Sequence, residues 1–190
     1  MRKIHTLFPD SDRRKFVMLR WGLIPFWAKD IKIGYKTINA RSETAPGKPA
    51  FRSAFKKRRC LIPADGFYEW KSAKGKREPY LVRLKDEQLF AFAGLWERWK
   101  GPDDDVIESC TILTTGANEF LSPIHDRMPV ILPARDYHAW LDPLVEEPET
   151  LLSLLVPYPP DEMTAVPVSS RVNKTSYDDP DCIAPIGESE

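Results

Sequence analysis

Long apolar runs are missing from this sequence of 190 residues, and no stretch approaches the roughly 20 residues that a membrane-spanning helix needs. The first ten residues also lack the apolar core and the small-residue cleavage site of a secretory signal. We therefore expect a cytoplasmic protein that makes no contact with a membrane. A hydrophobic fraction of 42% and six tryptophans indicate a packed globule rather than a disordered chain.

Cysteine is scarce, and the motifs of several common enzyme classes are absent. The three cysteines, Cys60, Cys110 and Cys182, are odd in number and far apart, which favours reduced thiols over a disulfide framework or a zinc site. The sequence has no His-Glu-x-x-His motif and no paired cysteines, so we expect no metal. A glycine-rich phosphate loop and a serine nucleophile elbow are also missing, and we expect no cofactor.

Negative charge is scarce in the first third of the chain. The whole sequence is neutral, with 28 Lys and Arg against 28 Asp and Glu, but residues 1–59 hold 16 basic and 4 acidic side chains. A surplus of this size favours a basic surface that binds a polyanion, with nucleic acid as the leading candidate. The alternative is two solvated faces of opposite sign, which is the usual meaning of a charge run.

Eighteen prolines and frequent turn signals argue against an all-helical fold. Hydrophobic patterning predicts strands at 16–24, 59–62, 67–72, 80–84, 89–96, 107–115, 128–132 and 163–168. It predicts helices at 48–57, 117–121, 133–141 and 149–155. We therefore predict an α+β fold, with a single domain over residues 1–190 and a surface tail at 171–190. Its sheet is expected to be curved or barrel-like and mainly antiparallel, with several short flanking helices.

Glu69 is enclosed by aromatic residues on one of the predicted strands. We expect Phe67 and Glu69 to face one way and Tyr68 and Trp70 the other, because side chains alternate along a strand. Aromatic neighbours exclude water, and desolvation raises a carboxyl pKa toward the range that is useful for proton transfer at neutral pH. The alternative is an edge glutamate that faces water.

Two further polar positions are candidates for the same site. His125 lies in a loop stiffened by flanking prolines and is followed by Asp and Arg, which suits a general acid or base. It could instead only satisfy a backbone carbonyl at a helix end. Asn39 could polarise a carbonyl or hold a sugar oxygen, or it could be a turn or cap residue. Arg41 would point the same way as Asn39 along an extended segment and could hold a phosphate.

The segment 21–27 combines a proline with several aromatic side chains. We expect Trp21 to lie in the core. Phe26 and Trp27 follow the proline, and we expect them to be available for stacking on a nucleic-acid base. Stacking aromatics beside a basic groove would give affinity for single strands.

Four segments carry a specific resemblance to a known family. They are Leu-Arg-Trp-Gly-Leu-Ile-Pro at 19–25, Ile-Asn-Ala-Arg-Ser-Glu-Thr at 38–44, Arg-Cys-Leu-Ile-Pro-Ala-Asp-Gly-Phe-Tyr-Glu-Trp at 59–70 and Ile-His-Asp-Arg-Met-Pro at 124–129. The tail Val-Ser-Ser-Arg-Val-Asn at 168–173 fits as well. Together they resemble the SOS response-associated peptidase (SRAP) family, whose members are also called abasic-site processing proteins.

The resemblance implies a reaction and a role for individual residues. Family members bind single-stranded DNA and trap abasic sites: the α-amine of an N-terminal cysteine condenses with the ring-opened sugar aldehyde, and its thiol closes a thiazolidine. By resemblance, Asn39 orients the cysteine and the sugar, Glu69 is the acid and base for imine formation, and His125 assists ring opening. The residues expected to contact DNA, from the resemblance and the stacking argument, are Arg41, Arg127, Phe26, Trp27, Trp70 and Thr114.

The N-terminus departs from the family pattern. Members begin Met-Cys-Gly-Arg, whereas this sequence begins Met-Arg-Lys and has no cysteine before Cys60. We therefore expect the chain as printed to lack the family's N-terminal strand and nucleophile, and to form no thiazolidine. Two alternatives stay open: a module that binds single-stranded DNA without covalent chemistry, and a peptidase that acts on its own leading segment. The expected partner is single-stranded DNA with abasic sites, bound by a monomer that joins the nucleoid when on DNA.

Overall fold

The computed structural model describes residues 2–10, 13–73, 75–86 and 88–186. The chain forms two compact units. The barrel unit comprises Met1–Pro63, Phe90–Gly116 and Pro129–Tyr158, and the sheet unit comprises Ala64–Leu89, Ala117–Met128 and Pro159–Glu190. The prediction that residues 1–190 form one domain stays a prediction.

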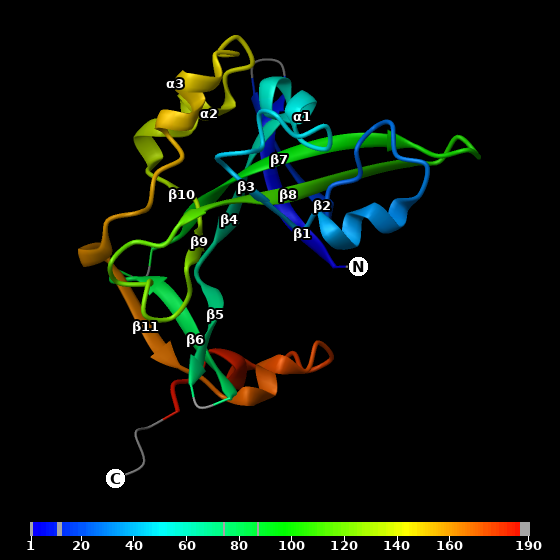
Figure 1. Ribbon diagram of the computed structural model, residues 1–190. Helices are drawn as coiled ribbons and strands as arrows, with labels where there is room; N and C mark the ends of the chain where they lie inside the picture. Colours follow the sequence, from blue (N-terminus) through cyan, green and yellow to red (C-terminus); the bar gives the residue numbers. More distant parts are fainter. Residues whose placement is uncertain (1, 11–12, 74, 87, 187–190) are drawn as a thin grey trace. The chain divides into compact units, whose positions relative to one another are not determined.

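Within the described residues, five strands of the barrel unit close into a ring (Figure 1). In order around the ring they are β1 (Lys3–Asp10), β2 (Arg13–Trp21), β8 (Val106–Gly116), β7 (Phe90–Lys100) and β4 (Arg59–Ala64). Outside the ring, β3 (Asn39–Arg41) pairs with β8, and β10 (Ile131–Leu132) pairs with β7. Most pairs are antiparallel, although β8 runs parallel to both β2 and β3. The predicted α+β fold with a barrel-like, mainly antiparallel sheet is confirmed.

The inner faces of the barrel strands pack on one another through alternate residues. Phe8 of β1 stacks on Trp96 of β7, with 4.7 Å between the ring centroids. The hydroxyl of Thr6 is fully buried and donates to Cys110 Sγ of β8 at 3.8 Å. Because side chains alternate along a strand, the residues between these positions face the outside of the barrel.

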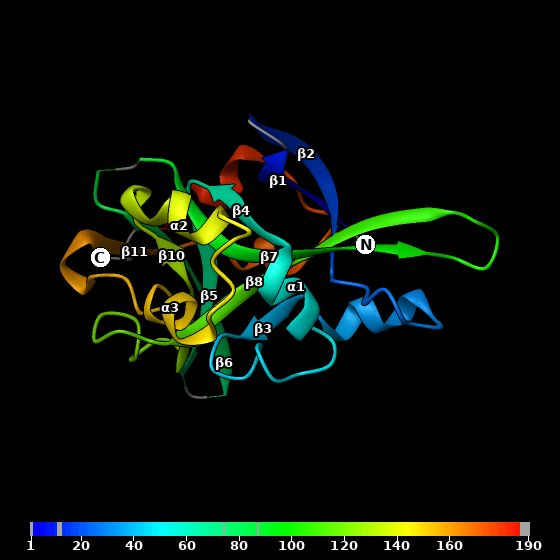
Figure 2. The same cartoon turned by 90° about the horizontal axis from the view of Figure 1, so that it is seen from above.

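Short helices cover part of that outer surface. They are α1 (Arg52–Lys57), α2 (Tyr137–Leu141) and α3 (Pro148–Ser153), with the 3-10 helices η1 (Ile31–Lys36) and η2 (Ala134–Asp136) beside them in the chain. Leu61 of β4 and Leu95 of β7 are buried in one cluster with Phe55 of α1 and Trp140 of α2. Figure 2 shows the three α-helices together in front of β4 and β7. The main hydrophobic core of the barrel unit therefore lies between these strands and the helices.

Gly94 in the middle of β7 marks a close contact inside the barrel. A Cβ at this position would lie 2.8 Å from Ile62 Cδ1 and 2.9 Å from Cys60 Sγ. We expect Gly94→Ala to lower the free energy of unfolding by about 1–3 kcal/mol, the usual cost of overpacking a core. Gly116→Ala is the matched control, because a Cβ there meets nothing within 4 Å. Urea denaturation that shows equal stability for the two variants would contradict this account.

The sheet unit is built on three antiparallel strands in the order β11–β6–β5. They are β5 (Phe67–Ala73), β6 (Lys76–Leu84) and β11 (Met163–Pro167). The 3-10 helix η3 (Pro160–Glu162) precedes β11 in the chain, and the 3-10 helices η4 (Ser170–Asn173) and η5 (Pro180–Ile183) follow it. The described part of the predicted tail returns to the sheet, since Val168 forms an isolated bridge with Pro185.

The predicted helix at 117–121 is wrong, because this segment is a run of turns. The side chain of Asn118 accepts the backbone N–H of Leu121 at 2.9 Å, and the carbonyl of Leu121 accepts the N–H groups of both Ile124 and His125. Asparagine side chains compete with the helical ladder in this way. The turns hold the loop that carries His125.

The prediction that Trp21 lies in the core is also wrong. Trp21 is half-buried, and its indole N–H donates to the carbonyl of Ile38 at 2.8 Å. The strand predicted at 16–24 ends at Trp21 because Gly22 adopts a φ of 115°, a conformation that breaks an extended strand. Buried Leu23 and Ile24 gave the segment its strand-like pattern without belonging to a ladder.

Other elements also differ from the prediction. The helix expected at 48–57 begins only at α1, after a series of turns. The strand expected at 128–132 is divided into β9 (Arg127–Pro129) and β10. Between them, Val130 donates to Leu113 of β8 and accepts from Ala93 of β7, so the chain passes from one strand to the next. Strand β1 was not predicted, and it pairs along its length with β2.

Candidate functional site

Glu69 lies in the middle of β5, a strand at the edge of the three-stranded sheet. It is paired with Tyr80 of β6 and is half-buried. One carboxylate oxygen, Oε1, accepts the backbone N–H of Trp70 at 3.2 Å. The carboxylate is therefore partly withdrawn from solvent and fixed at one oxygen, while the edge of the sheet leaves the other side accessible.

The pKa of the Glu69 carboxyl is raised above its ordinary value, chiefly because burial removes water from the charged form. The hydrogen bond from Trp70 and the charge of His125 oppose this shift, and the charge of Asp126 adds to it. The predicted effect of desolvation on this pKa is confirmed. A carboxyl with a raised pKa can take up and release a proton closer to neutral pH.

His125 is held by a loop that closes on itself. The N–H of Ala117 donates to the carbonyl of Asp126 at 3.0 Å, so that the two ends of the loop are joined. Leu121, which is fully buried, anchors the middle of the loop, and the Asn118 amide lies 3.2 Å from Met163 Sδ of β11. The stiff loop predicted from the flanking prolines is present, and it owes its rigidity to these contacts as well.

The contacts of the His125 ring are made through Nδ1. The backbone N–H of Arg127 lies 3.0 Å from Nδ1 and the carbonyl of Arg127 lies 3.2 Å from it, so Nδ1 accepts or donates according to the tautomer. Asp126 Oδ1 lies 3.2 Å from the same Nδ1 and can accept from it when that nitrogen carries a proton. The ring is exposed to solvent. This arrangement suits proton transfer.

Trp70, next to Glu69, is fixed by the C-terminal segment. Its indole Nε1–H donates to Asn173 Oδ1 of η4 at 2.8 Å. Its ring lies 6.4 Å from that of Tyr68, whose hydroxyl donates to the carbonyl of Cys182. Tyr68 and Trp70 thus share one face of β5, as the alternation predicts. Trp70 is half-buried, with its orientation set by a partner distant in sequence.

In the barrel unit, Asn39 and Arg41 are the first and last residues of β3. Both are exposed and Ala40 between them is buried, so the two polar side chains lie on the same face, as predicted. Strand β3 runs parallel to β8 with Arg41 opposite Thr114, which is half-buried. An amide, a guanidinium and a hydroxyl therefore come from two adjacent strands.

Phe26 and Trp27 lie in the turn that follows Pro25. They are 57% and 48% exposed, and the Trp27 indole N–H reaches the carbonyl of Pro49 at 3.3 Å. The turn is closed by the N–H of Ala28, which donates to the carbonyl of Pro25. The accessibility expected of these two aromatics is confirmed. Two adjacent exposed aromatic rings are available for stacking on a nucleic-acid base.

The structure brings the sequence candidates together in two groups. Glu69, Trp70, His125 and Arg127 lie in the sheet unit, and Asn39, Arg41, Thr114, Phe26 and Trp27 lie in the barrel unit. Their roles stay predictions. Sequence reasoning gave no role to Asp126 or Asn173, although both stand in the quoted motifs and contact candidate residues.

In the described part of the chain, no group of three His, Cys, Asp or Glu could hold a metal, and no helix is long and apolar enough to cross a membrane.

Known proteins share both the sequence and the fold. The family described as SOS response associated peptidase (SRAP) matches residues 2–175. The chain is 50% identical over 181 residues to the abasic site processing protein YoqW of Bacillus subtilis, covering 95% of this chain and 81% of that protein. It is 34% identical over 200 residues to the abasic site processing protein HMCES of Xenopus tropicalis, covering 93% of this chain and 59% of HMCES.

A solved structure of a protein from Bacteroides thetaiotaomicron superposes with a TM-score of 0.90 at 30% identity, covering 97% of this chain and 81% of that chain. A second, from Bordetella bronchiseptica, superposes with a TM-score of 0.78 at 33% identity, covering 88% of this chain and 84% of that chain. Sequence and fold agree, and the chain belongs to the SOS response associated peptidase (SRAP) family.

Proposed function

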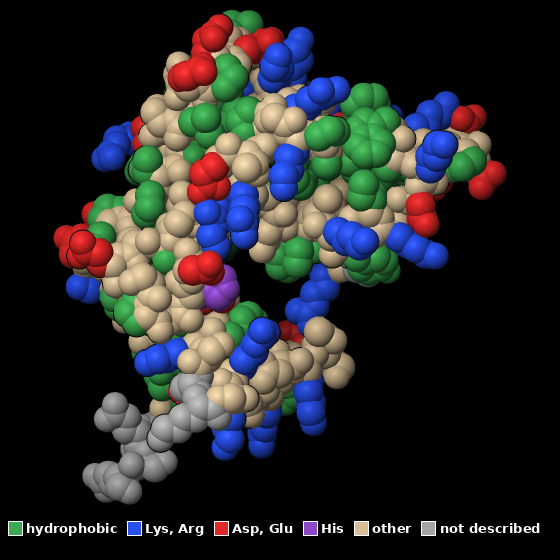
Figure 3. Space-filling view, viewed as in Figure 1, with side chains coloured by type: hydrophobic (Ala, Val, Ile, Leu, Met, Phe, Trp, Pro, Cys, Tyr) green, Lys and Arg blue, Asp and Glu red, His purple; other side chains and the backbone are tan. Residues whose placement is uncertain are grey.

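We propose that this chain binds single-stranded DNA and processes abasic sites in it, as part of a response to DNA damage. The observation that carries the proposal is the half-buried Glu69, whose raised pKa suits proton transfer, beside His125 on a closed loop. Relatives at 50% and 34% identity are named abasic site processing proteins. Basic side chains are numerous on the face displayed in Figure 3, which suits a phosphate backbone.

The chemistry begins with opening of the abasic sugar ring. Breaking the ring requires a proton to leave the C1′ hydroxyl and another to reach the ring oxygen, so that a free aldehyde forms. Glu69 and His125 would carry these two protons. An amine then adds to the aldehyde and water leaves, giving an imine. A neighbouring thiol adds to the imine carbon, and the nitrogen takes up a proton to complete the thiazolidine.

Contacts with the strand would come from the other candidates. Asn39 would hold the sugar or the attacking group, and Arg41 and Arg127 would bind phosphates. Phe26, Trp27 and Trp70 would stack on bases, with Thr114 as a minor polar contact. Such contacts alone would make the chain a non-covalent binding module. The exposure of Phe26 and Trp27 is the observation that favours this second candidate function.

The three cysteines of the sequence do not suit the final ring closure. A thiazolidine needs a thiol and an amine on adjacent carbons, which an internal cysteine in a peptide chain does not offer. Burial also raises the pKa of the Cys110 thiol to about 12 and that of Cys60 well above its ordinary value, so both stay protonated. We propose that the sequence as printed opens the sugar but closes no thiazolidine through its own cysteines.

Free cysteine supplied in solution provides the test, because it carries both reacting groups. A short single strand with one abasic site is incubated with free cysteine, with and without the protein, and thiazolidine formation is followed by mass spectrometry. We expect the protein to accelerate the reaction, since ring opening limits the supply of aldehyde. Denaturing gels should show no heat-stable protein–DNA adduct. Equal rates with and without protein, combined with tight binding, would favour the non-covalent module.

A further inference from the structure

One stripe of the β1–β2 hairpin faces away from the barrel interior. The register pairs Lys3 with Arg20, His5 with Met18 and Leu7 with Phe16. Phe16 is 58% exposed and Met18 is 50% exposed, whereas Thr6 and Leu19, on the opposite face of the hairpin, are buried. The hairpin therefore presents large apolar side chains to solvent, bordered by basic residues at its open end.

Two rings on this stripe are already stacked. The imidazole of His5 and the ring of Phe16 lie parallel, with 4.9 Å between centroids and an interplanar angle of 6°. Both side chains are exposed. Parallel stacking at this spacing is the geometry that a nucleic-acid base adopts on an aromatic side chain. A base could extend the stack on the open side of Phe16.

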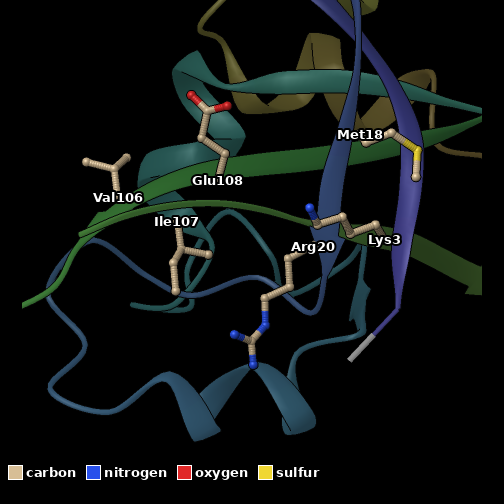
Figure 4. Close-up of a pocket in the computed structure, with 6 residues that line it drawn as sticks. All are labelled: Lys3, Met18, Arg20, Val106, Ile107 and Glu108. Atoms are coloured by element: carbon tan, nitrogen blue, oxygen red, sulfur yellow. The ribbon is translucent and has the colours of Figure 1, made fainter.

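A surface pocket of about 580 Å³ adjoins the stripe. Figure 4 shows its lining, which comes from the hairpin and from the start of β8. The lining residues are Lys3, Met18, Arg20, Val106, Ile107 and Glu108. A lining that combines apolar and basic side chains matches an unpaired base and its phosphate. Glu108 is the one acid in this lining, so the pocket keeps a positive balance.

This part of the barrel differs from the outer faces of β4 and β7. There, residues such as Leu61 and Leu95 are buried beneath the helices. In Figure 2 the hairpin lies away from α2 and α3. Exposed apolar side chains gathered on one face mark an interaction surface. The neighbouring charges on Lys3 and Arg20 select a polyanion with flat, stackable groups as its occupant.

We propose that the β1–β2 stripe, defined as Lys3, His5, Phe16, Met18 and Arg20, is a second contact surface for single-stranded DNA that binds unpaired bases flanking the lesion. The proposal rests on the proposed function for the identity of the strand. It adds a base-stacking surface on strands that carry none of the candidate reaction residues, which lie on β3, β5 and the His125 loop. It predicts that longer strands bind more tightly than short ones because they reach this surface.

The test measures fluorescence anisotropy with a 20-nucleotide thymidine strand and with a strand of equal length made of baseless tetrahydrofuran spacers. We expect Phe16→Ala to weaken binding to the thymidine strand by about 5-fold or more, the effect of losing one stacked base. On the baseless strand, the variant and the original protein should bind alike. Phe16→Tyr keeps the ring and should bind thymidine like the original protein.

Leu144→Ala is the matched control, because it removes another exposed apolar side chain from the barrel unit. It should leave both affinities unchanged. Equal binding of the thymidine strand by Phe16→Ala and the original protein would overturn the proposal, as would self-association that Phe16→Ala abolishes. Phe16→Ala should still accelerate the reaction of a short abasic strand with free cysteine. If the binding test contradicts the second contact surface, this reaction still supports the proposed function. If the original protein binds neither strand, both proposals fail.

Discussion

Glu69→Gln is expected to slow the protein-assisted reaction of an abasic strand with free cysteine by about 100-fold or more, the usual contribution of a general acid or base. The amide cannot exchange a proton in the relevant range, yet it has nearly the shape of the carboxylate. Its carbonyl oxygen can still accept the N–H of Trp70, so the local structure of β5 should persist. The measurement is the initial rate of thiazolidine formation at saturating protein.

The same substitution has an opposite expected effect on stability. A group whose pKa is raised by folding stabilises the fold while it is protonated and loses that contribution as pH rises through the folded-state pKa. At neutral pH the ionised Glu69 therefore opposes folding, and Glu69→Gln should unfold at the same or a higher temperature than the original protein. The difference should shrink as pH falls below the ordinary glutamate range, where Glu69 is neutral. Thermal unfolding followed across pH checks this sign.

Glu78→Gln separates the loss of a proton-transfer group from the loss of a charge. Glu78 lies on β6 of the same sheet, and its side chain is exposed. It should keep the reaction rate of the original protein. A Glu69→Gln variant that reacts as fast as Glu78→Gln would remove Glu69 from the mechanism. A Glu69→Gln variant that unfolds at a lower temperature would show that its slow reaction reflects damage to the sheet.

Hydrophobic patterning predicted strands β4, β5 and β8 close to their observed bounds. In β4 and β8, consecutive residues are buried on both faces of the strand, in the barrel interior or beneath the helices. Patterning failed where backbone geometry decides the outcome. Gly22 ends β2 early, and the Asn118 side chain replaces a helix with turns. Neither event changes the spacing of apolar residues.

The candidate site was predictable to the extent that it depends on local geometry. The common face of Asn39 and Arg41 follows from the period of a strand, and the raised pKa of Glu69 follows from its burial. Contacts between distant segments could not be predicted. The hydrogen bond from Trp70 to Asn173 joins residues 103 positions apart, and neither segment contains a sequence signal that predicts this contact. The contacts of His125 Nδ1 with Arg127 and Asp126 likewise depend on the turn that the loop adopts.

Arg59 makes hydrogen bonds with distant segments that the sequence does not predict. Arg59 is 2% exposed, and its guanidinium donates to the carbonyls of Phe55, Lys56, Trp140 and Asp142. These carbonyls lie at the C-terminal ends of α1 and α2. The last carbonyls of a helix have no hydrogen-bond partner within that helix and carry partial negative charge. Burial lowers the pKa of Arg59, and the carboxylates of Asp142 and Glu146 partly offset that shift. One side chain thus joins two helices to β4.

Replacing Arg59 by Met is expected to lower the free energy of unfolding by about 3–5 kcal/mol, because several carbonyls lose a buried charged donor at once. Arg59→Lys should recover part of this loss, since an ammonium can reach some of the carbonyls but lacks the planar fork that bonds all of them. Arg52→Met is the matched control: Arg52 is exposed at the start of α1, and its loss should change stability by less than about 0.5 kcal/mol. Urea denaturation of the three variants distinguishes these cases. If Arg59→Met were as stable as Arg52→Met, apolar packing against Trp140 would hold the helices, and the hydrogen bonds would contribute little.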